Sequence, residues 1–272
     1  MSISLRKTNW LSRLQQEVKI EGFAVIEEFL SSSFLEETRE AMYFALNEVT
    51  NQIGDERISR AKEIGIIRTP MAFHPLFFKF IQFEEVLRII DAVLSKTAIL
   101  HLQNGFILPP SFDENTRKVF QNSWHMDFPR ILGGYLASIN LFFTIDDFSK
   151  VNGATLVSPK SHQLDEPPSI DQLESSAIHL EVPAGSLIVF DSTLWHTAGS
   201  NDSQKNRLAI NHQFTQPFFK QQIDYCRALG KELVLKQTPR TQQLLGWFSR
   251  PPASLYEFYA PDKERTYRSG QG

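Results

Sequence analysis

A histidine and an aspartate two positions apart, His125 and Asp127, stand at the end of an expected β-strand. Because side chains alternate along a strand, both would point to the same face. An imidazole and a carboxylate that meet a second histidine form the facial triad that binds non-haem Fe(II) and leaves coordination positions open. The spacing therefore indicates a metal site, provided that a second histidine reaches it.

The spacing alone is a weak signal, because the stretch at 179–181 also reads His-x-Glu. The residues downstream separate the two. His196 follows an apolar run and Arg207 lies eleven positions beyond it, whereas the stretch at 179–181 has no such partners. We therefore predict that His125, Asp127 and His196 bind the metal. The ordinary alternative is two hydrogen-bonded core histidines and a turn carboxylate.

Together with the stretch 146–162, these four residues resemble the phytanoyl-CoA dioxygenase family of Fe(II)- and 2-oxoglutarate-dependent oxygenases. The stretch contains paired acids, then Asn152-Gly153, and ends in Pro-Lys-Ser-His. The resemblance is clearest over 103–214 and suggests membership over the full length. It implies that Arg207 holds the far carboxylate of 2-oxoglutarate. A guanidinium suits this role because it grips a carboxylate through two nitrogens and keeps its charge.

The resemblance also implies the reaction. With Fe(II) as cofactor and 2-oxoglutarate and O₂ as cosubstrates, such enzymes most often hydroxylate an unactivated C–H bond of a small-molecule metabolite, for example in secondary metabolism. The 2-oxoglutarate becomes succinate and CO₂. The carboxylate of Asp127 argues against halogenation, which needs chloride at that coordination position. No catalytic residue is expected beyond the metal ligands.

Two functions from other classes stay open. One is a cupin-like divalent-metal hydrolase or isomerase, and the other is a jelly roll that binds a small molecule without catalysis. Arg207 favours the oxygenase, because neither alternative needs a cation at that point. For Arg207 itself, the ordinary alternative is a surface ion pair.

Further contacts are expected around the metal. Candidate 2-oxoglutarate contacts besides Arg207 are Thr155, Gln103 and Thr197, with Asn104 as a neighbour of Gln103. Candidate substrate contacts are Phe128, Arg130, Arg68 and Met71, and the polar stretch 53–72 is expected to form a lid over the substrate.

Three positions depart from the resembled pattern. Lys160 stands where the family often has Gly, Leu108 stands where it often has Lys, and Ala198 stands where it often has Ser. We therefore expect altered secondary contacts to the cosubstrate, with Thr197 or Thr155 as the helper of Arg207.

The fold expected around these residues is α+β but mainly β, with a double-stranded β-helix (jelly-roll, cupin-like) core and N-terminal helices packed outside it. Helical periodicity appears in 10–18, after a capping box at Ser33 and Glu36, and after Pro75. A further helical segment covers 223–235. Short β-rich runs separated by turn residues predict strands at 98–108, 118–125, 135–145, 155–157, 177–182, 187–190 and 207–214.

Composition limits the remaining possibilities. The 272 residues predict one oxygenase domain over 1–272, with a helical part at about 1–96, the β core at about 97–216 and a helical extension at about 217–272. A net charge of −3 without a basic patch argues against a nucleic-acid partner. The absence of a long apolar run argues against a membrane partner. The single Cys226 and the lack of a signal-like start favour the cytoplasm.

Overall fold

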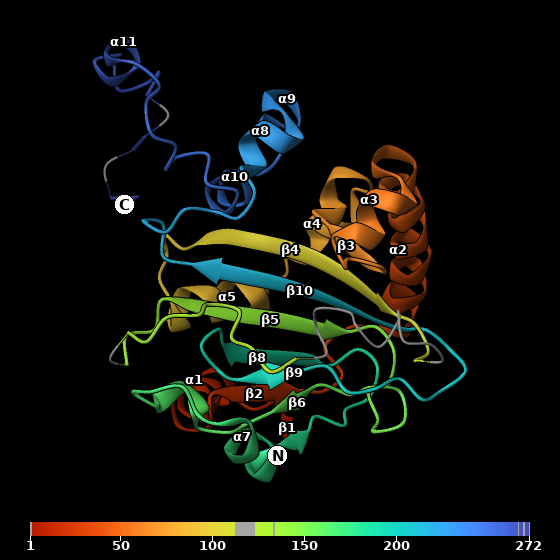
Figure 1. The fold of residues 1–272 in the computed structure, drawn as a ribbon. Coiled ribbons are helices and arrows are strands. Elements are labelled where there is room, and N and C mark those ends of the chain that lie inside the picture. The colour runs from red at the N-terminus through yellow and green to blue at the C-terminus, as the bar shows by residue number, and fades with distance from the viewer. Residues whose placement is uncertain (1, 112–122, 133, 266, 269, 272) are drawn as a thin grey trace.

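The computed structural model of the protein describes residues 2–111, 123–132, 134–265, 267–268 and 270–271. In this part of the chain, a seven-stranded sheet in the order β1-β2-β8-β5-β10-β4-β3 lies beside a three-stranded sheet in the order β7-β6-β9 (Figure 1). The large sheet consists of β1 (Ser2–Ile3), β2 (Phe23–Ile26), β3 (Ile66–Arg68), β4 (Ile99–Leu108), β5 (Ser138–Thr144), β8 (Leu187–Asp191) and β10 (Arg207–Thr215). The small sheet consists of β6 (Leu156–Val157), β7 (Ile178–His179) and β9 (His196–Thr197).

Helices surround the large sheet and follow it at the C-terminus (Figure 1). Those ahead of β4 in sequence are α1 (Trp10–Glu21), α2 (Ser32–Ile53), α3 (Asp55–Arg60), α4 (Leu76–Lys79) and α5 (Glu84–Val93). Helix α7 (Ile170–Ser176) precedes β7, and α8 (Tyr225–Leu229), α9 (Lys231–Leu235), α10 (Pro239–Leu244) and α11 (Leu255–Phe258) follow β10. Short 3-10 turns occur at Pro70–Ala72 and Ser161–Gln163. The expected α+β fold with a jelly-roll core is confirmed.

The large sheet is covered on both faces. In β5, Ile139, Leu141 and Phe143 belong to the core under the helices, whereas Phe142 belongs to a second core between the two sheets. A strand buried on both faces reads as a nearly continuous apolar run instead of an alternating one. Asn140 interrupts this run on the side of Phe142, and the alternation therefore directs its polar side chain between the sheets.

The N-terminal part differs from the expected helical segment. Strands β1, β2 and β3 all lie before residue 97 and join the large sheet. Each has two to four residues, which is too short to show alternation in sequence. Helix α2 also begins earlier than expected, because Ser31 is its N-cap and accepts a hydrogen bond from the Phe34 N–H (3.3 Å).

The expected lid over 53–72 is wrong in its second half. Strand β3 pairs with β4, Ile67 is fully buried, and Pro70–Ala72 forms a 3-10 turn against the core. The expected helix over 223–235 is divided at Gly230, whose φ of 80° ends α8. The expected strand at 118–125 lies largely outside the described residues. None of the described helices is both long and apolar enough to cross a membrane.

Aromatic rings join the helices to the large sheet. Phe80 is fully buried, and its ring centroid lies 5.0 Å from that of Phe143 on β5 and 5.2 Å from that of Phe34 on α2. Such ring pairs add to the stabilisation from apolar burial. Phe80 therefore connects two helical segments to the central strand.

We expect Phe80→Ala to lower the free energy of unfolding by about 3–5 kcal/mol, because the substitution leaves a cavity among rings that cannot collapse fully. Denaturant unfolding measures the change. Phe218→Ala is the control, since Phe218 is 63% exposed and its loss should change stability by about 0.5 kcal/mol or less. Equal effects of the two substitutions would contradict this account of the core.

A buried histidine makes stability depend on pH. His212 on β10 stacks on Phe80 (5.6 Å between centroids), and its Nε2 accepts a hydrogen bond from the Gln103 side-chain amide (2.7 Å). Burial lowers the pKa of His212 to about 3, whereas the unfolded chain takes up this proton near pH 6.5. The stability that neutral His212 provides is present above pH 6.5 and is lost as pH falls toward 3.

We therefore expect the stability of the metal-free protein to fall between pH 6.5 and pH 4, and to fall less in His212→Leu. The variant is less stable at pH 7, because it leaves one N–H of the Gln103 amide without an acceptor, but it has no buried imidazole to protonate. Urea unfolding at several pH values compares the two slopes. Parallel pH profiles would show that His212 does not carry the dependence.

Candidate metal centre

A backbone pairing brings the first and last predicted ligands together. The His125 N–H donates to the His196 carbonyl and the His196 N–H donates to the His125 carbonyl, both at 3.0 Å. His196 begins β9 in the small sheet. The two imidazoles consequently lie side by side, with ring centroids 4.3 Å apart.

Each imidazole is oriented by its other nitrogen. His125 Nδ1 bonds to the Ser123 carbonyl (2.7 Å) and His196 Nδ1 bonds to the Leu194 carbonyl (2.9 Å). A carbonyl accepts only, so each Nδ1 carries the proton and each Nε2 offers a lone pair. The Nε2 atoms lie 3.5 Å (His125) and 3.7 Å (His196) from Asp127 Oδ1. This arrangement is the one that metal-binding histidines commonly have.

The two oxygens of Asp127 have different surroundings. Oδ2 accepts a short hydrogen bond from the Asn140 side chain and a longer one from Asn211 Nδ2 (3.5 Å). Asn140 is held in turn by Ser192, whose hydroxyl donates to its Oδ1 (2.9 Å). Asp127 Oδ1 is thereby left on the side of the histidines. The three donor atoms of His125, Asp127 and His196 lie within 4.8 Å of one another.

The turn after β8 supports two of the three ligands, His196 and Asp127. The carbonyl of Leu194 accepts from His196, the hydroxyl of Ser192 holds Asn140, and the carbonyl of Ser192 accepts the N–H of Phe128 (2.8 Å), next to Asp127. Ser192 and Leu194 are buried. A short turn therefore fixes both the histidine and the carboxylate side of the cluster.

Protonation favours metal binding near neutral pH. Burial, helped by the nearby His125, lowers the pKa of His196 to about 4. Burial alone would raise the pKa of Asp127, but His196, His125 and the hydrogen bond from Asn140 together lower it below its usual range. At pH 7 the cluster thus offers an ionised carboxylate and a neutral His196, which are the forms that bind a divalent metal.

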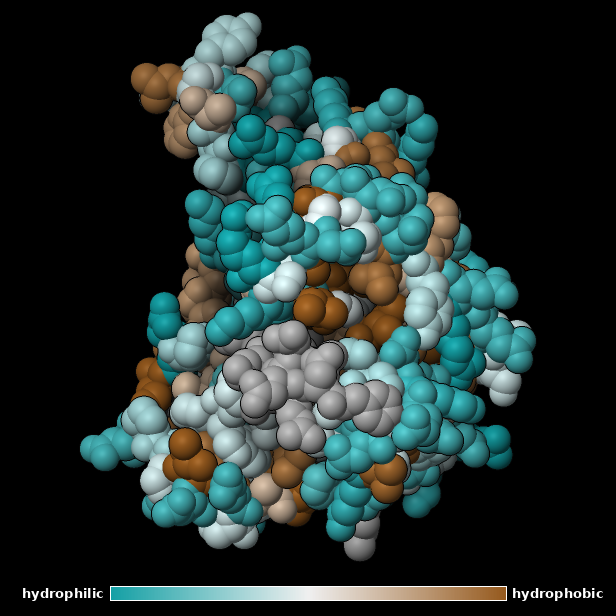
Figure 2. Space-filling view, turned by 45° about the vertical axis from the view of Figure 1, so that its right-hand side comes forward, coloured by the Kyte–Doolittle hydropathy of each residue, from teal (hydrophilic) through white to brown (hydrophobic). Residues whose placement is uncertain are grey.

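The three donors open into a cavity of about 300 Å³ between the two sheets. Its wall is mainly apolar, with a few polar side chains that converge on the metal cluster, which is typical of small-molecule sites. Figure 2 shows a hollow in one face of the molecule in which hydrophobic side chains gather. Besides the three ligands, the cavity is lined by Ile66, Arg68, Leu102, Asn104, Phe106, Met126, Pro129, Phe142, Thr155, Val157, Leu180, Ile188, Phe190, Ala198, Arg207, Asn211 and Gln222.

Arg207 is the buried cation of this cavity. It is 2% exposed, its Nη1 donates to the Gly153 carbonyl (2.7 Å), and its guanidinium carbon lies 4.1 Å from the Phe148 ring centroid. Within the described chain, its Nε has no hydrogen-bond partner. Burial lowers the pKa of Arg207 to about 9, so it stays charged at neutral pH. A buried guanidinium with an unused donor fits a carboxylate ligand.

The Asn-Gly motif positions this arginine. Gly153 has a φ of 80°, and a Cβ there would lie 2.6 Å from the Gly199 carbonyl oxygen. Glycine is therefore required, and the resulting turn directs its carbonyl to Arg207. Leu108 packs on the same turn, because its Cδ2 lies close to Gly153. Lys160, where the resembled pattern often has glycine, adopts a φ of 66°.

Of the predicted secondary contacts, Thr155, Arg68 and Asn104 line the cavity. Gln103, predicted to contact 2-oxoglutarate, does not line it. Strand alternation turns it to the helical face, where its amide bonds to the Met71 N–H, the Phe77 carbonyl and His212.

Met71, predicted to contact the substrate, does not line the cavity either, because it is 2% exposed and belongs to the core under the helices. Thr197 and Phe128 do not line the cavity either; the ring of Phe128 packs on Phe219 at 4.9 Å. Arg130 lines a neighbouring pocket instead. His179 and Glu181 flank Leu180, which faces the cavity, and so both point away from the metal cluster.

Sequence reasoning missed Asn140, Asn211 and Ser192. The available signal was a polar residue inside an otherwise apolar strand, as in the run Ser138–Thr144. Such a residue must find hydrogen-bond partners when it is buried. The sequence does not show that the partner of Asn140 is Asp127.

One protein-family model matches most of the chain. The family model described as phytanoyl-CoA dioxygenase (PhyH) matches residues 19–209, which include all three metal-cluster residues and Arg207. The chain belongs to the phytanoyl-CoA dioxygenase family. Membership places it among the Fe(II)- and 2-oxoglutarate-dependent dioxygenases.

The chain is also similar to individual proteins and, in its fold, to solved structures. An uncharacterized protein of Mycobacterium tuberculosis is 52% identical over 99% of both chains. The dioxygenase olcK of Penicillium canescens is 26% identical over 58% of this chain and 49% of its own length. Among solved structures, EctD from S. alaskensis with 2-oxoglutarate and 5-hydroxyectoine superposes with a TM-score of 0.62 at 17% identity, covering 75% of each chain. This last likeness shows the shared fold.

We expect His196→Ala to weaken Co(II) binding by at least about 100-fold, because one of three protein ligands is lost. Equilibrium dialysis of the metal-free protein measures the affinity. His179→Ala is the matched control, since His179 lies in the similar His-x-Glu spacing but away from the cluster. The Co(II) affinity of this variant should be unchanged. Equal losses in both variants would remove His196 from the metal site.

Proposed function

We propose that this phytanoyl-CoA dioxygenase family member binds Fe(II) through His125, Asp127 and His196 and uses 2-oxoglutarate and O₂ to oxidise a small molecule. Hydroxylation of an unactivated C–H bond is the proposed outcome. The observation that carries the proposal is Arg207: a buried guanidinium with an unused Nε lies in the same cavity as the three donors.

The donor set fits iron. Two imidazoles and one carboxylate on one side of the metal form a facial triad, which suits Fe(II) and leaves positions for other ligands. The Nδ1 hydrogen bonds fix both imidazoles, and Asn140 fixes the carboxylate. The chain therefore orients its metal ligands before any metal arrives, which lowers the cost of assembling the site.

The wall of the cavity fits 2-oxoglutarate, a molecule with a carboxylate at each end. Arg207 is proposed to hold the carboxylate far from the metal, with Thr155 as a neutral donor beside it. Phe106, Ile188 and Phe190 line the same cavity and limit the access of water. In such surroundings a charge-assisted hydrogen bond is stronger than in water.

Bound iron supplies the oxidising chemistry together with its cosubstrates, and the chain supplies orientation and the exclusion of water. On the substrate side, Arg68 is the charged residue proposed to meet a polar group of the substrate. It pairs with Glu63 (2.5 Å between Nη2 and Oε1) and, with the Asn104 amide oriented to suit both of its neighbours, donates to Asn104 (2.9 Å). These contacts hold its guanidinium at the cavity wall.

We expect Fe(II) and 2-oxoglutarate together, without O₂, to give a visible charge-transfer band that neither gives alone, because the band requires the cosubstrate to bind the metal.

Arg207→Leu should weaken the 2-oxoglutarate affinity by at least about tenfold while Fe(II) binding persists, since a charged hydrogen-bonding partner is lost. Anaerobic titration followed by absorbance measures both effects.

Arg130→Leu serves as the control, because Arg130 lines a different pocket and should leave the titration unchanged. A folded protein that binds Fe(II) but shows no band would favour the metal hydrolase, isomerase or binding-protein alternatives. If the band appears, release of succinate that depends on an added metabolite would identify the substrate.

A further inference from the structure

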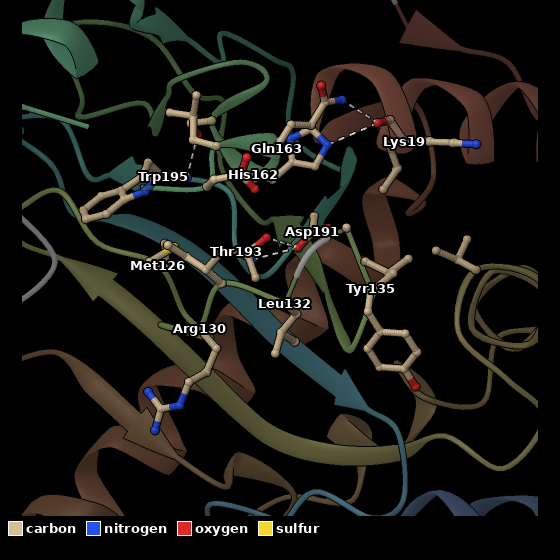
Figure 3. Close-up of a pocket in the computed structure, with 18 of the residues that line it drawn as sticks. Lys19, Met126, Arg130, Leu132, Tyr135, His162, Gln163, Asp191, Thr193 and Trp195 are labelled. Atoms are coloured by element: carbon tan, nitrogen blue, oxygen red, sulfur yellow. Dashed lines mark hydrogen bonds between the residues drawn. The ribbon is translucent and has the colours of Figure 1, made fainter. Parts of the chain in front are cut away.

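A second pocket, of about 480 Å³, adjoins the metal cavity, and Met126 lines both. It lies between the ends of α1 and α5, residues 130–132 and 134–136, the segment 161–167, and the turn 191–195 (Figure 3). Neither Arg207 nor any of the three metal-cluster residues lines it. The pocket is therefore a separate site.

Its wall is largely apolar. Helix α1 contributes Val18, helix α5 contributes Val93, and the segment after the metal pair contributes Leu132 and Leu136. Trp195 adds an aromatic surface from the turn. A hydrophobic lining of this size is typical of a small-molecule site.

One carboxylate stands out in this apolar surrounding. Asp191 Oδ1 accepts hydrogen bonds from the Thr193 N–H (2.8 Å) and the Thr193 hydroxyl (2.7 Å). Within the described chain, no hydrogen bond reaches Oδ2 and no side chain forms an ion pair with Asp191 within 4.0 Å. Burial raises the pKa of Asp191, although the Thr193 hydrogen bonds oppose the shift.

Lys19, Arg130 and His162 are the basic residues that line the pocket. Within the described residues, none of them lies within ion-pair distance of Asp191. Arg130 Nη1 donates to the Pro129 carbonyl (2.7 Å), and Figure 3 shows its guanidinium pointing away from Asp191. His162 Nε2 bonds to the Lys19 carbonyl (3.2 Å), and the Lys19 ammonium also points away from Asp191 (Figure 3). Of these groups, the imidazole of His162 acts on Asp191 electrostatically, in the direction that lowers the pKa of Asp191.

The remaining charged groups that line the pocket, Asp165 and Glu166, are acidic. They add negative potential, which disfavours an anionic ligand and favours a cationic one. A partly buried carboxylate oxygen without a hydrogen-bond donor is costly, and a ligand whose ammonium donates to it removes this cost.

We propose that this second pocket binds a hydrophobic molecule with a cationic amine, whose ammonium donates to Asp191 Oδ2 while its apolar body packs against Leu132, Leu136 and Trp195. The ammonium forms a charge-assisted hydrogen bond, and burial of the body supplies the hydrophobic part of the affinity. The inference does not depend on the proposed oxygenase function.

Calorimetric titration of the full-length protein at pH 7.5 tests the proposal with three probes of one shape: 4-phenylbutylamine, 4-phenylbutanol and 4-phenylbutanoate. The amine should bind with a Kd at least about tenfold lower than the alcohol, and the carboxylate should bind least. Asp191→Asn keeps the shape and the Thr193 hydrogen bonds but removes the charge. It should bring the amine and the alcohol to equal affinity.

Two further variants locate the probe. Asp165→Asn should retain the preference for the amine, and so should Asp127→Asn, which removes the carboxylate of the metal cavity. Leu132→Trp, which fills part of the pocket, should weaken the amine. No binding of the amine, equal affinity for amine and alcohol, or a preference lost in Asp127→Asn but kept in Asp191→Asn would each overturn the proposal.

Discussion

The reciprocal backbone hydrogen bonds between His125 and His196 are the contact on which the site depends. They join the segment that carries Asp127 to the small sheet, and they set the two imidazoles side by side. Because Asp127 follows two residues after His125, the same pairing also places the carboxylate. The contact from the Phe128 N–H to the Ser192 carbonyl adds a second attachment. Without this pairing, the ligands would belong to two independent segments.

The two charged side chains of the cavity, Asp127 and Arg207, differ in how far the protein satisfies them. Asp127 Oδ2 accepts hydrogen bonds from two asparagine amides, so this side of the carboxylate is satisfied before any ligand binds. Arg207 has one carbonyl and one aromatic face, and an unused Nε. A buried charge that the protein itself does not fully satisfy is a place where binding an anion is favourable. The protein thus orients the carboxylate of the metal cluster itself, whereas the guanidinium of Arg207 keeps a donor for a carboxylate ligand.

The sequence was sufficient for the residues that are defined by spacing. His125, Asp127, His196 and Arg207 were predicted from intervals along the chain, and the structure brings them to one cavity. Gln103 was misplaced, because a strand buried on both faces gives no alternation from which to read the direction of a side chain. Met71 was misplaced because it lies in a 3-10 turn that packs on the core. Asn140 was missed for a related reason: its partner lies in a different segment, and sequence spacing does not encode contacts between segments. The short strands β1, β2 and β3 were invisible because pairing with longer neighbours, and not local propensity, defines them.

The turn at 191–195 serves two sites at once. Ser192 and Leu194 hold the metal ligands, whereas Asp191, Thr193 and Trp195 line the second pocket. Adding or deleting one residue would move the Leu194 carbonyl away from His196 and the Ser192 hydroxyl away from Asn140. The length of this segment is consequently fixed by the metal centre, while the identities at 191, 193 and 195 are free to change with the ligand of the neighbouring pocket. A protein engineer would redesign that pocket by substitution and keep the turn at five residues.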